Sequence, residues 1–577
     1  MAFYMSPIVD VNEIDLSTTI PAVATSIGVS ILRNTYKGPE RKKVLITNTN
    51  NLIGTFGKPT NIANCYQDVL AATGFLRYGN ALYCTRTMPV SATFAGTKAA
   101  SGSDAIFDAF TTNNAYKLSD FDSEDPDEFG TEVAVASPSP FYLIAISRGA
   151  WGNNIRVAVA DNNTYNSIAS GGAGCGTGQA HTDIEAIDSP LLDAKDFLIV
   201  VSVKDQGETA YTVKEYFNVS TMENRYDDQG RRTFCETIIN QTSQYIRISM
   251  CEDAKNSDIV ISSDGYQDFG GGSDYNALDP LDVVTDALVM TDLDLYANPE
   301  EIDINIFIDS NKSTTVKEYI DTICQTRKDC IAVLDCLDSD VINNRGSEAT
   351  DLRTYRRETL NLNSSYSALY GNWLEVYDKW NGKYRWIPAS GHVAGVFVNT
   401  DDVSDPWFAP AGLNRALLSN VRRLAWNPTL GERDVLYKAG VNPIVSFSGQ
   451  GKVVWGQKTQ LDKESAFNRI NVRRLFIVLE KAISTAAKYF LFEPNDDLTR
   501  LLLINMIDPF LRDVKSRRGI YDYMIVCNET NNTPERIDRN ELWCDIYIKP
   551  TRAAEFIVLN FIATKTGASF TELATAV

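Results

Sequence analysis

The run SGQGK at residues 448–452 is the stretch that comes nearest to a phosphate-binding loop. In such a loop, backbone N–H groups and a lysine hold nucleotide phosphates, and the required pattern is G-x-x-x-x-G-K followed by Ser or Thr. Ser446 stands where the first glycine is needed, and Val453 follows the lysine. The glycine triplet at 270–272 also lacks the strand-to-helix setting of a dinucleotide site. We therefore expect no nucleotide cofactor.

A hydrolytic triad would need one of the two histidines in the chain, His181 or His392. Ser390 lies two residues before His392, but no G-x-S-x-G motif frames it as a nucleophile. Asp and Glu are so frequent in this chain that a pair of carboxylates does not by itself indicate a catalytic general acid and base. The sequence predicts no catalytic residue and no enzyme, and we expect His392 to be a structural residue of a turn region at 388–395.

Three of the ten cysteines, Cys324, Cys330 and Cys336, recur every six residues. A structural zinc site takes four Cys or His ligands, usually at closer spacings within each pair. With only two histidines in the chain, the pattern predicts no metal ligands. In a reducing compartment such cysteines are normally buried free thiols, which is the structure we expect here.

The formal net charge of the 577 residues is −20, whereas a nucleic-acid-binding protein needs a basic surface. No apolar run approaches the ~18 residues of a membrane span, and the first residues lack the pattern of a signal peptide. These features predict a cytoplasmic protein with no direct nucleic-acid contact and no membrane insertion. Residues 421–577 carry 22 Lys and Arg against 18 Asp and Glu, which leaves 32 of the 54 basic and 56 of the 74 acidic residues for the rest.

The last quarter of the chain has the clearest helical periodicity. Apolar residues at intervals of four and three predict a helix over 472–490. Polar residues at 495–497 predict the start of a second helix, since their side chains can cap it, and Gly519 is placed to end it. Pro509 is expected to kink or break this second helix. The apolar stripe of the first helix consists of Val472, Phe476, Leu479, Ile483, Ala486 and Phe490.

Three strand patterns follow, at 521–527, 542–548 and 556–563. The last has almost no polar alternation, so we expect it to be covered on both faces. With the two helices, these strands predict an α/β or α+β unit.

Upstream, strand–helix–strand patterns predict mixed sheets flanked by helices. They are interrupted by a long stretch rich in Ser, Thr, Gly, Asn and Asp, with short strand patterns at 141–146, 155–160, 197–204 and 245–250. The predicted fold class is α/β (α+β), multidomain, with a β-rich insertion and extended terminal arms. The predicted parts are an N-terminal arm (1–20), a core in two pieces (21–95 and 276–425), the insertion (96–275), a C-terminal domain (426–566) and a C-terminal arm (567–577).

Five aromatic residues gather within fourteen positions. They could form a sugar-binding platform, but a cross-strand core or a subunit contact is the interpretation that we favour. These residues are Trp373, Tyr377, Trp380, Tyr384 and Trp386.

The N-terminal arm alternates apolar and polar residues, which predicts an exposed strand. It could belong to the chain's own sheet, or it could add to a sheet of another subunit through backbone hydrogen bonds. Twenty extended residues span up to ~66 Å at ~3.3 Å each, while a compact chain of this length has a radius of gyration of only ~25 Å. The arm could therefore reach a neighbour, and the short C-terminal arm could do so over a smaller gap. The candidate strand-exchange residues are Ile8, Val9, Val11, Ile14, Leu16, Phe570 and Leu573.

Several motifs, in order along the chain, resemble the tail sheath proteins of contractile-tailed (myovirus-type) bacteriophages. The resemblance covers roughly residues 1–95 and 300–577, and the middle matches poorly, as expected of a variable insertion. The motifs are SPIVDVNEIDL (6–16), IPASGHVAG (387–395), WFAPAG (407–412), GVNPI (440–444), VWGQKT (454–459), RINVRRL (469–475), DRN (538–540) and YIKP (547–550).

The resemblance implies a structural subunit that stacks in hexameric rings around a tail tube and contracts to drive the tube through the host envelope for genome delivery. It implies further copies of the chain, the tail tube protein, and the baseplate and tail terminator proteins as partners, in a virion assembled in the host cytoplasm. A close alternative is the sheath of a bacterial phage-tail-like contractile injection particle. A remote alternative is a cytoplasmic hydrolase with a β-rich binding insertion.

The family also places the C-terminal domain innermost, against the tube, and inserted domains outermost. Four cations near the end of the second predicted helix are therefore candidate contacts to an acidic tube surface. The alternative is a solvated helix end, where cations interact favourably with the helix dipole. The four residues are Arg512, Lys515, Arg517 and Arg518.

Overall fold

The computed structural model divides the chain into two compact units. The larger comprises Ala22–Pro406 and Pro410–Lys481, and the smaller includes Trp407–Ala409 and the chain from Ala482 onward. The larger unit therefore retains residues 426–481, which differs from the predicted boundary at 426. The described residues are 26–61, 65–98, 108–109, 140–169, 179–187, 193–227, 229–259, 265–274 and 284–559.

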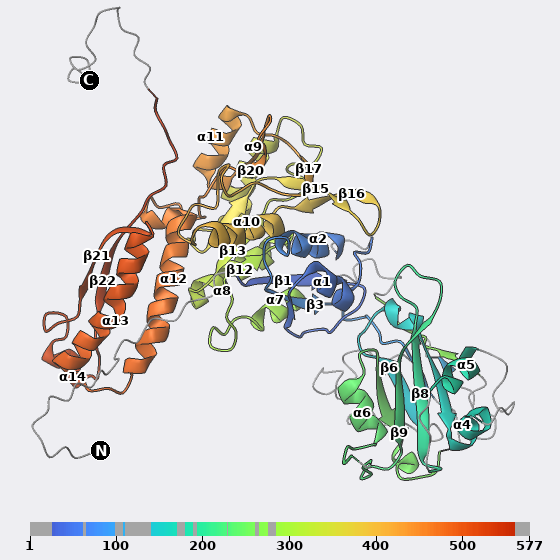
Figure 1. Cartoon of the computed structure of the whole chain (residues 1–577). Coiled ribbons are helices and arrows are strands. Elements are labelled where there is room, and N and C mark those ends of the chain that lie inside the picture. Colours follow the sequence, from blue (N-terminus) through green and yellow to red (C-terminus); the bar gives the residue numbers. More distant parts are fainter. Residues whose placement is uncertain are drawn as a thin grey trace, which may run out of the picture. The chain divides into compact units, whose positions relative to one another are not determined.

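A seven-stranded sheet forms the centre of the larger unit (Figure 1), in the order β18-β14-β13-β12-β1-β3-β2. All neighbouring strands are parallel except β2, which runs antiparallel to β3. Strands from residues 28–87 thus lie beside strands from residues 306–442. The strands are β1 (Gly28–Arg33), β2 (Val44–Ile46), β3 (Leu82–Thr87), β12 (Ile306–Ile308), β13 (Ile331–Asp335), β14 (Ser367–Tyr370) and β18 (Val441–Asn442).

Helices cover both faces of this sheet, so alternate strand residues enter two separate hydrophobic cores. Leu32 packs with one group of helices, while its neighbour Ile31 packs with the other. The first core contains side chains of α1 (Thr49–Phe56), α2 (Cys65–Phe75) and α10 (Ser390–Val403). The second contains side chains of α7 (Asp286–Asp294), α8 (Thr314–Arg327), α9 (Glu348–Thr354), the π-helical turn η5 (Tyr355–Leu360) and α11 (Leu430–Ala439).

The inserted region contains two four-stranded sheets, and their strands share one hydrophobic core. The strand patterns predicted at 141–146, 155–160, 197–204 and 245–250 are confirmed as β6, β7, β8 and β10, whereas the largely exposed β9 was not predicted. One sheet is β10 (Ile246–Met250), β6 (Phe141–Ala145), β4 (Gly96–Lys98) and β5 (Asp108–Ala109). The other is β11 (Gln267–Asp268), β7 (Ile155–Asp161), β8 (Asp196–Val203) and β9 (Thr212–Ser220), and the helices are α4 (Asn162–Ala169), α5 (Gln179–Glu185) and α6 (Cys235–Thr242).

A buried Arg–Glu–Arg cluster joins this region to the core. The carboxylate of Glu40 accepts hydrogen bonds from Arg86 Nη1 at 2.9 Å and from Arg148 Nη2 at 2.6 Å. All three side chains are almost fully buried. A buried charge is stable only when it is paired in this way, so the cluster fixes the root of the insertion to the core.

Two smaller sheets complete the larger unit. The first confirms the cross-strand interpretation of the aromatic cluster, because Tyr377 pairs with Tyr384 across the strands, with ring centroids 5.2 Å apart. Trp373 on the same hairpin is buried. The first sheet is β16 (Lys383–Pro388), β15 (Trp373–Asp378) and β17 (Val421–Leu424), and the second is β19 (Ile444–Phe447) with β20 (Gly451–Val454).

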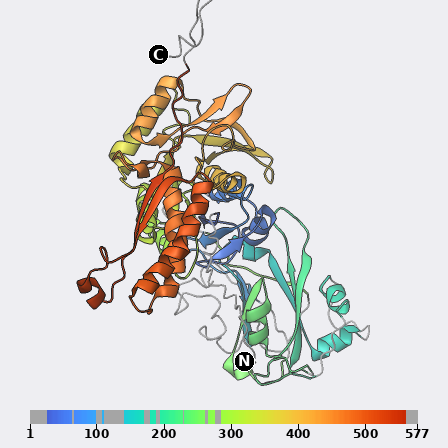
Figure 2. The ribbon, with the colours of Figure 1, turned by 60° about the vertical axis from the view of Figure 1, so that its left-hand side comes forward.

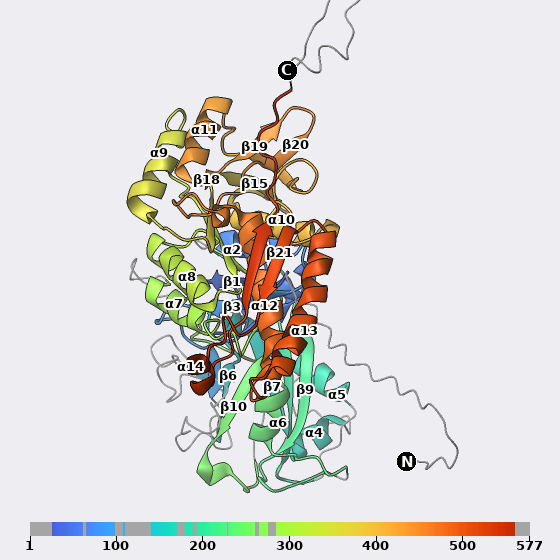
Figure 3. The ribbon, with the colours of Figure 1, turned by 90° about the vertical axis from the view of Figure 1, so that its left-hand side faces the viewer.

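The smaller unit contains the end of α12, a second long helix and a two-stranded sheet, with β21 packed along α13 (Figure 3). The predicted helix cap is confirmed: the Asp496 side chain accepts a hydrogen bond from the N–H of Thr499. Leu503, Ile507 and Leu511 form the buried face of α13. The elements are α12 (Ile470–Ala487), η7 (Lys488–Phe490), α13 (Asp497–Ser516), β21 (Ile520–Val526), α14 (Pro534–Asp538) and β22 (Asp545–Pro550).

Two local predictions are wrong, and one is corrected in part. Pro509 does not break helix α13, which continues through it; the proline lies on the exposed side, where water can bond the carbonyl that proline leaves unpaired. The predicted turn at 388–395 is instead largely the start of α10, a helix buried on nearly every side and therefore without an amphipathic stripe. Residues Phe556–Leu559 are exposed, extended chain after β22 (Figures 1 and 2), not a buried strand. Residues 560–563 lie outside the described part.

Candidate assembly surfaces

The carboxyl ends of the central parallel strands are where open α/β sheets usually bind ligands. Here the position is filled by charged side chains. Asp68 accepts hydrogen bonds from Arg33 Nη2 at 2.8 Å and from Lys312 Nζ at 3.0 Å. Burial alone would raise the pKa of Asp68, but the two cations lower it. Burial and the neighbouring Arg33 lower the pKa of Lys312 to about 8.

A second set of buried charges adjoins the first. Asp309 lies 3.4 Å from the ammonium of Lys317, and Asp335 accepts a hydrogen bond from the N–H of Ser390 at 2.7 Å. Burial, together with the charge of Asp309, raises the pKa of Asp335 to about 7. These six charged residues are at most 8% exposed. Because they bond to one another and to backbone groups, the arrangement is that of a structural network between two halves of the sheet.

The phosphate-loop look-alike at 448–452 forms the turn between the antiparallel strands β19 and β20. Gly449 and Gly451 both have positive φ, at 76° and 91°, which suits a tight hairpin turn. A phosphate loop would instead lead from a strand into a helix.

His392 lies in α10 against Gly74 of α2 and is buried. Neither ring nitrogen has a hydrogen-bond partner in the described chain. Burial, reinforced by the charge of Arg77, lowers the pKa of His392 to about 4. The imidazole is therefore neutral near pH 7 and fills space between two helices.

The cysteines at 324, 330 and 336 are buried free thiols, as predicted. Within the described residues, there is no group of three or more His, Cys, Asp or Glu side chains that could hold a metal ion. Over the same residues, no helix is long and apolar enough to cross a membrane.

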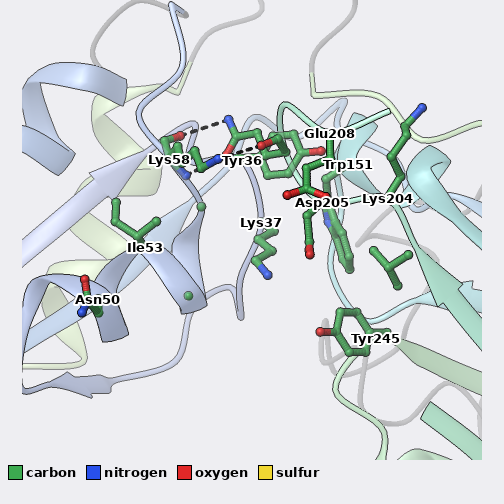
Figure 4. A pocket seen from close by; sticks show the side chains of 14 residues that line it. Tyr36, Lys37, Asn50, Ile53, Lys58, Trp151, Lys204, Asp205, Glu208 and Tyr245 are labelled. Carbon is green, nitrogen blue, oxygen red and sulfur yellow. Dashed lines mark hydrogen bonds between the residues drawn. The ribbon is translucent and has the colours of Figure 1, made fainter. Parts of the chain in front are cut away.

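A cleft of about 390 Å³ lies between the core and the insertion (Figure 4). Tyr36 and Tyr245 line it, and Lys58 and Gln206 close one side. The backbone N–H and the ammonium of Lys58 donate to Gln206, and the Gln206 amide donates to the Lys58 carbonyl oxygen, at 2.7–3.2 Å. The cleft contains both ammonium and carboxylate groups, so its charge favours neither an anionic nor a cationic ligand. The charged lining residues are Lys37, Lys58, Lys204, Asp205 and Glu208.

The four cations predicted to contact a tube lie at the end of α13. Three of them have local carboxylate partners: Arg512 pairs with Asp508, Lys515 with Asp522, and Arg517 with Asp513. Arg517 also stacks over the ring of Trp407, with 5.2 Å from the guanidinium carbon to the ring centroid. Arg518 has a positive φ of 66° just before Gly519. The structure thus brings the four cations together at the end of α13. The local carboxylates neutralise part of their charge.

The candidate strand-exchange residues at 8–16, and Phe570 and Leu573, lie outside the described residues. The structure does describe a surface that sequence reasoning missed. Among the described residues, strands β21 and β22 form a sheet of only two strands, and its exposed side chains include Tyr521, Met524 and Tyr547. The run Phe556–Leu559 follows with each side chain 72–85% exposed. The unbroken apolar sequence at Phe556–Leu559 was the signal for this surface.

The connection between α12 and α13 adds a second exposed apolar group. Tyr489 is 79% exposed, Leu491 is 63% exposed and the Phe492 side chain is fully exposed. Phe492 also has a positive φ of 69°, which is uncommon for a bulky residue. Apolar exposure of this extent is typical of protein–protein contact sites.

Two adjacent stretches match family models. Residues 303–460 match the phage tail sheath protein central domain, and residues 462–564 match the phage tail sheath C-terminal domain. Over these residues the chain is similar to the phage tail sheath proteins.

Individual relatives show the same similarity. The tail sheath protein of Vibrio phage KVP40 is 38% identical over 394 residues, which are 65% of this chain and 56% of that protein. The chain thus spans little more than half of this relative. The tail sheath protein of Enterobacteria phage T4 is 29% identical, with 99% of both chains covered. A crystal structure of a sheath tail protein from Listeria innocua has the same fold, with a TM-score of 0.51, 10% identity, and coverage of 92% of this chain and 96% of that one.

Proposed function

We propose that the chain is the structural subunit of a contractile tail sheath, which forms stacked rings around a tail tube and contracts to drive it through the host envelope. One observation carries the proposal beyond this similarity. An apolar strand pattern at Phe556–Leu559 is exposed beside a sheet that has only two strands among the described residues. Both features are expected of a subunit that completes its sheets with strands of its neighbours.

A two-stranded sheet is marginal by itself, and each free edge presents unpaired N–H and C=O groups. Within the described residues, β21 and β22 pair only with each other. An extended segment of another subunit can add to such an edge, with backbone hydrogen bonds supplying affinity. Residues 8–16 and the C-terminal chain from Phe556 are the segments that we assign to this exchange.

Contraction then requires two packings of the same folded subunit that differ in free energy. Strands exchanged between neighbours keep the subunits tethered while their other contacts change. The buried network around Asp68 keeps the core rigid during this change. The cycle uses no catalytic residue and no cofactor, and the energy comes from the difference between the two packings.

The partners in this proposal are further copies of the chain, in hexameric rings, and the tail tube protein. In this proposal, baseplate proteins contact one end of the sheath and terminator proteins contact the other. The protein assembles in the host cytoplasm and functions in the virion. At the tube, Arg512, Lys515, Arg517 and Arg518 are the proposed contacts.

The test is electron microscopy of the purified protein and of variants in the exposed strand. The unmodified protein should polymerise into hollow, helically striated tubes. Deleting residues 1–20, or replacing Ile557 and Leu559 with Asp, should leave a folded monomer that forms no tubes. Val90→Asp with Val403→Asp is the matched control, because these valines are exposed to a similar extent, 63% and 64%. Ordered tubes from the deletion or the Asp variant would contradict strand exchange, and uniform small particles from the unmodified protein would contradict the sheath role.

A further inference from the structure

A cavity of about 560 Å³ lies at helices α9 and α11 of the larger unit. Three of its lining side chains are cations, Arg353, Arg357 and Lys438, and we call this surface the three-cation pocket. Val435, which is 40% exposed, and Ala439 supply an apolar wall. Such a cluster is unexpected on a chain whose formal net charge is −20.

The local structure neutralises only part of this charge. Asp462 is the one carboxylate paired with the cluster in the described chain, at 3.4 Å from Arg357 Nη1. The same Asp462 oxygen lies 3.5 Å from Arg356 Nη2, so two guanidinium groups share it. No ion pair is recorded for Arg353 or Lys438 in the described part of the chain. The C-terminal dipole of α11 favours Lys438, but it does not account for two arginines on the adjoining helix.

Arg356 adds an independent sign of missing negative charge. Its side chain is fully buried in the π-helical turn that continues α9. Only its Nη2 atom is bonded, to the carbonyl oxygen of Gln460 at 2.8 Å and to Asp462, while Nε and Nη1 have no partner among the described residues. Arg353 and Arg357 are also four residues apart along the helix, a spacing at which like charges destabilise. Four cations with one shared carboxylate are typical of a surface that binds an acidic partner.

The sequence contains a segment with matching chemistry. Residues 120–128 include six carboxylates in nine positions, and no Lys or Arg occurs between Lys117 and Arg148. Phe121 and Phe129 lie within and just after this run, so they could contact the apolar wall. The segment lies outside the described residues.

We infer that the three-cation pocket binds the acidic segment 120–132 of a neighbouring copy of this chain. The contact joins the insertion of one subunit to the core of the next. As a contact between copies it rests on the proposed sheath function, but the binding step can be measured on single subunits. Carboxylates would pair with the three exposed cations, and the phenylalanines would cover Val435 and Ala439.

The test uses a fluorescent peptide of residues 118–132 and the full-length protein, with the carboxylates at 120–128 changed to Asn and Gln so that its own segment does not compete. The peptide should bind, and Arg353→Gln, Arg357→Gln and Lys438→Gln together should weaken its affinity about tenfold or more, as expected from three charge contacts. A peptide with Asn and Gln in place of its acids should not bind. The control is Lys379→Gln, Lys383→Gln and Arg422→Gln, which removes three exposed cations on the β15–β16–β17 sheet.

Equal binding of the peptide to the pocket variant and to the control variant would overturn the inference. Absence of binding to the full-length protein with the changed segment 120–128 and an intact pocket would also overturn it. Peptide bearing Phe121→Ala and Phe129→Ala should bind more weakly than the natural peptide but still respond to the pocket substitutions. If the peptide binds as expected while microscopy shows no tubes, the sheath proposal fails and the pocket assignment stands. If tubes form but the peptide does not bind, the reverse holds.

Discussion

Gly391 of α10 lies directly against the backbone of Ala71 in α2. A Cβ atom at position 391 would come 2.0 Å from the Ala71 carbonyl oxygen. A second close approach involves Gly395 of α10, where a Cβ would meet the ring of Tyr78, just beyond the end of α2, at 2.5 Å and the carbonyl oxygen of Gly74 in α2 at 3.2 Å. These contacts set the distance between two helices that cover one face of the central sheet, and they explain why glycine occupies this part of α10.

Replacing Gly391 with alanine should therefore destabilise the protein by about 2–3 kcal/mol, since backbone atoms of α2 would have to shift. The measurement is the free energy of unfolding in urea. Gly54→Ala in α1 is the control, because nothing lies within 4 Å of its added Cβ. That change should be neutral or stabilise by about 0.5–1 kcal/mol through helix propensity. Equal effects of the two substitutions would show that the α2–α10 contact is not tight.

Asp68→Asn tests the buried network. The substitution removes the charge that compensates Arg33 and Lys312, and it should lower the free energy of unfolding by about 3–5 kcal/mol, because it leaves two buried cations without their shared partner. Asp227→Asn is the control at an exposed Arg231 pair in the insertion, and its denaturation midpoint should match that of the unmodified protein. A loss below about 1 kcal/mol for Asp68→Asn would mean that water or another group solvates the two cations.

His392 should make the core sensitive to acid. The pKa of His392 is lowered to about 4 in the folded protein. In an unfolded chain the pKa of a histidine is about 6.5. The unfolded state thus binds the proton more readily, so the stability from the neutral imidazole is present above pH 6.5 and is lost as pH falls toward 4. His392→Met should reduce the loss of unfolding free energy between pH 7 and pH 4.5 by roughly 1–3 kcal/mol. An unchanged pH dependence in this variant would assign the acid response to other groups.

The four cations at the end of α13 should contribute to binding the tube. Changing Arg512, Lys515, Arg517 and Arg518 together to Gln should slow assembly on purified tubes, with the larger effect at low salt, because exposed charge contacts are screened. Thermal unfolding of the monomer should shift only slightly, since the partners Asp508, Asp513 and Asp522 remain exposed to water. If the variant assembles on tubes as fast as the unmodified protein, these four residues do not contact the tube and serve only their local ion pairs.

The sequence predicted elements where local patterns match local structure. The apolar period of α12, the capping side chain before α13 and the strand–helix–strand pattern from Ile306 to Asp335 depend on residues near each other in the chain. Helix α10 was missed because it is buried on nearly every side, which removes the apolar stripe. The partners of Arg473 and of Arg474 could not be predicted from local patterns either, because those partners are distant in sequence or depend on the fold. Arg474 binds Asp401, and Arg473 stacks on Tyr366 and Phe467.

The sequence by itself predicted the class of this protein, because the ordered motifs are a property of the chain alone. Only the tertiary structure decided which surfaces can join subunits. Phe556–Leu559 have the composition of a buried strand, yet they are exposed, since no strand among the described residues pairs with them. Likewise Arg353, Arg357 and Lys438 gather at one pocket only because α9 packs against α11. Burial and charge clustering depend on residues distant in sequence, and the fold alone brings those together.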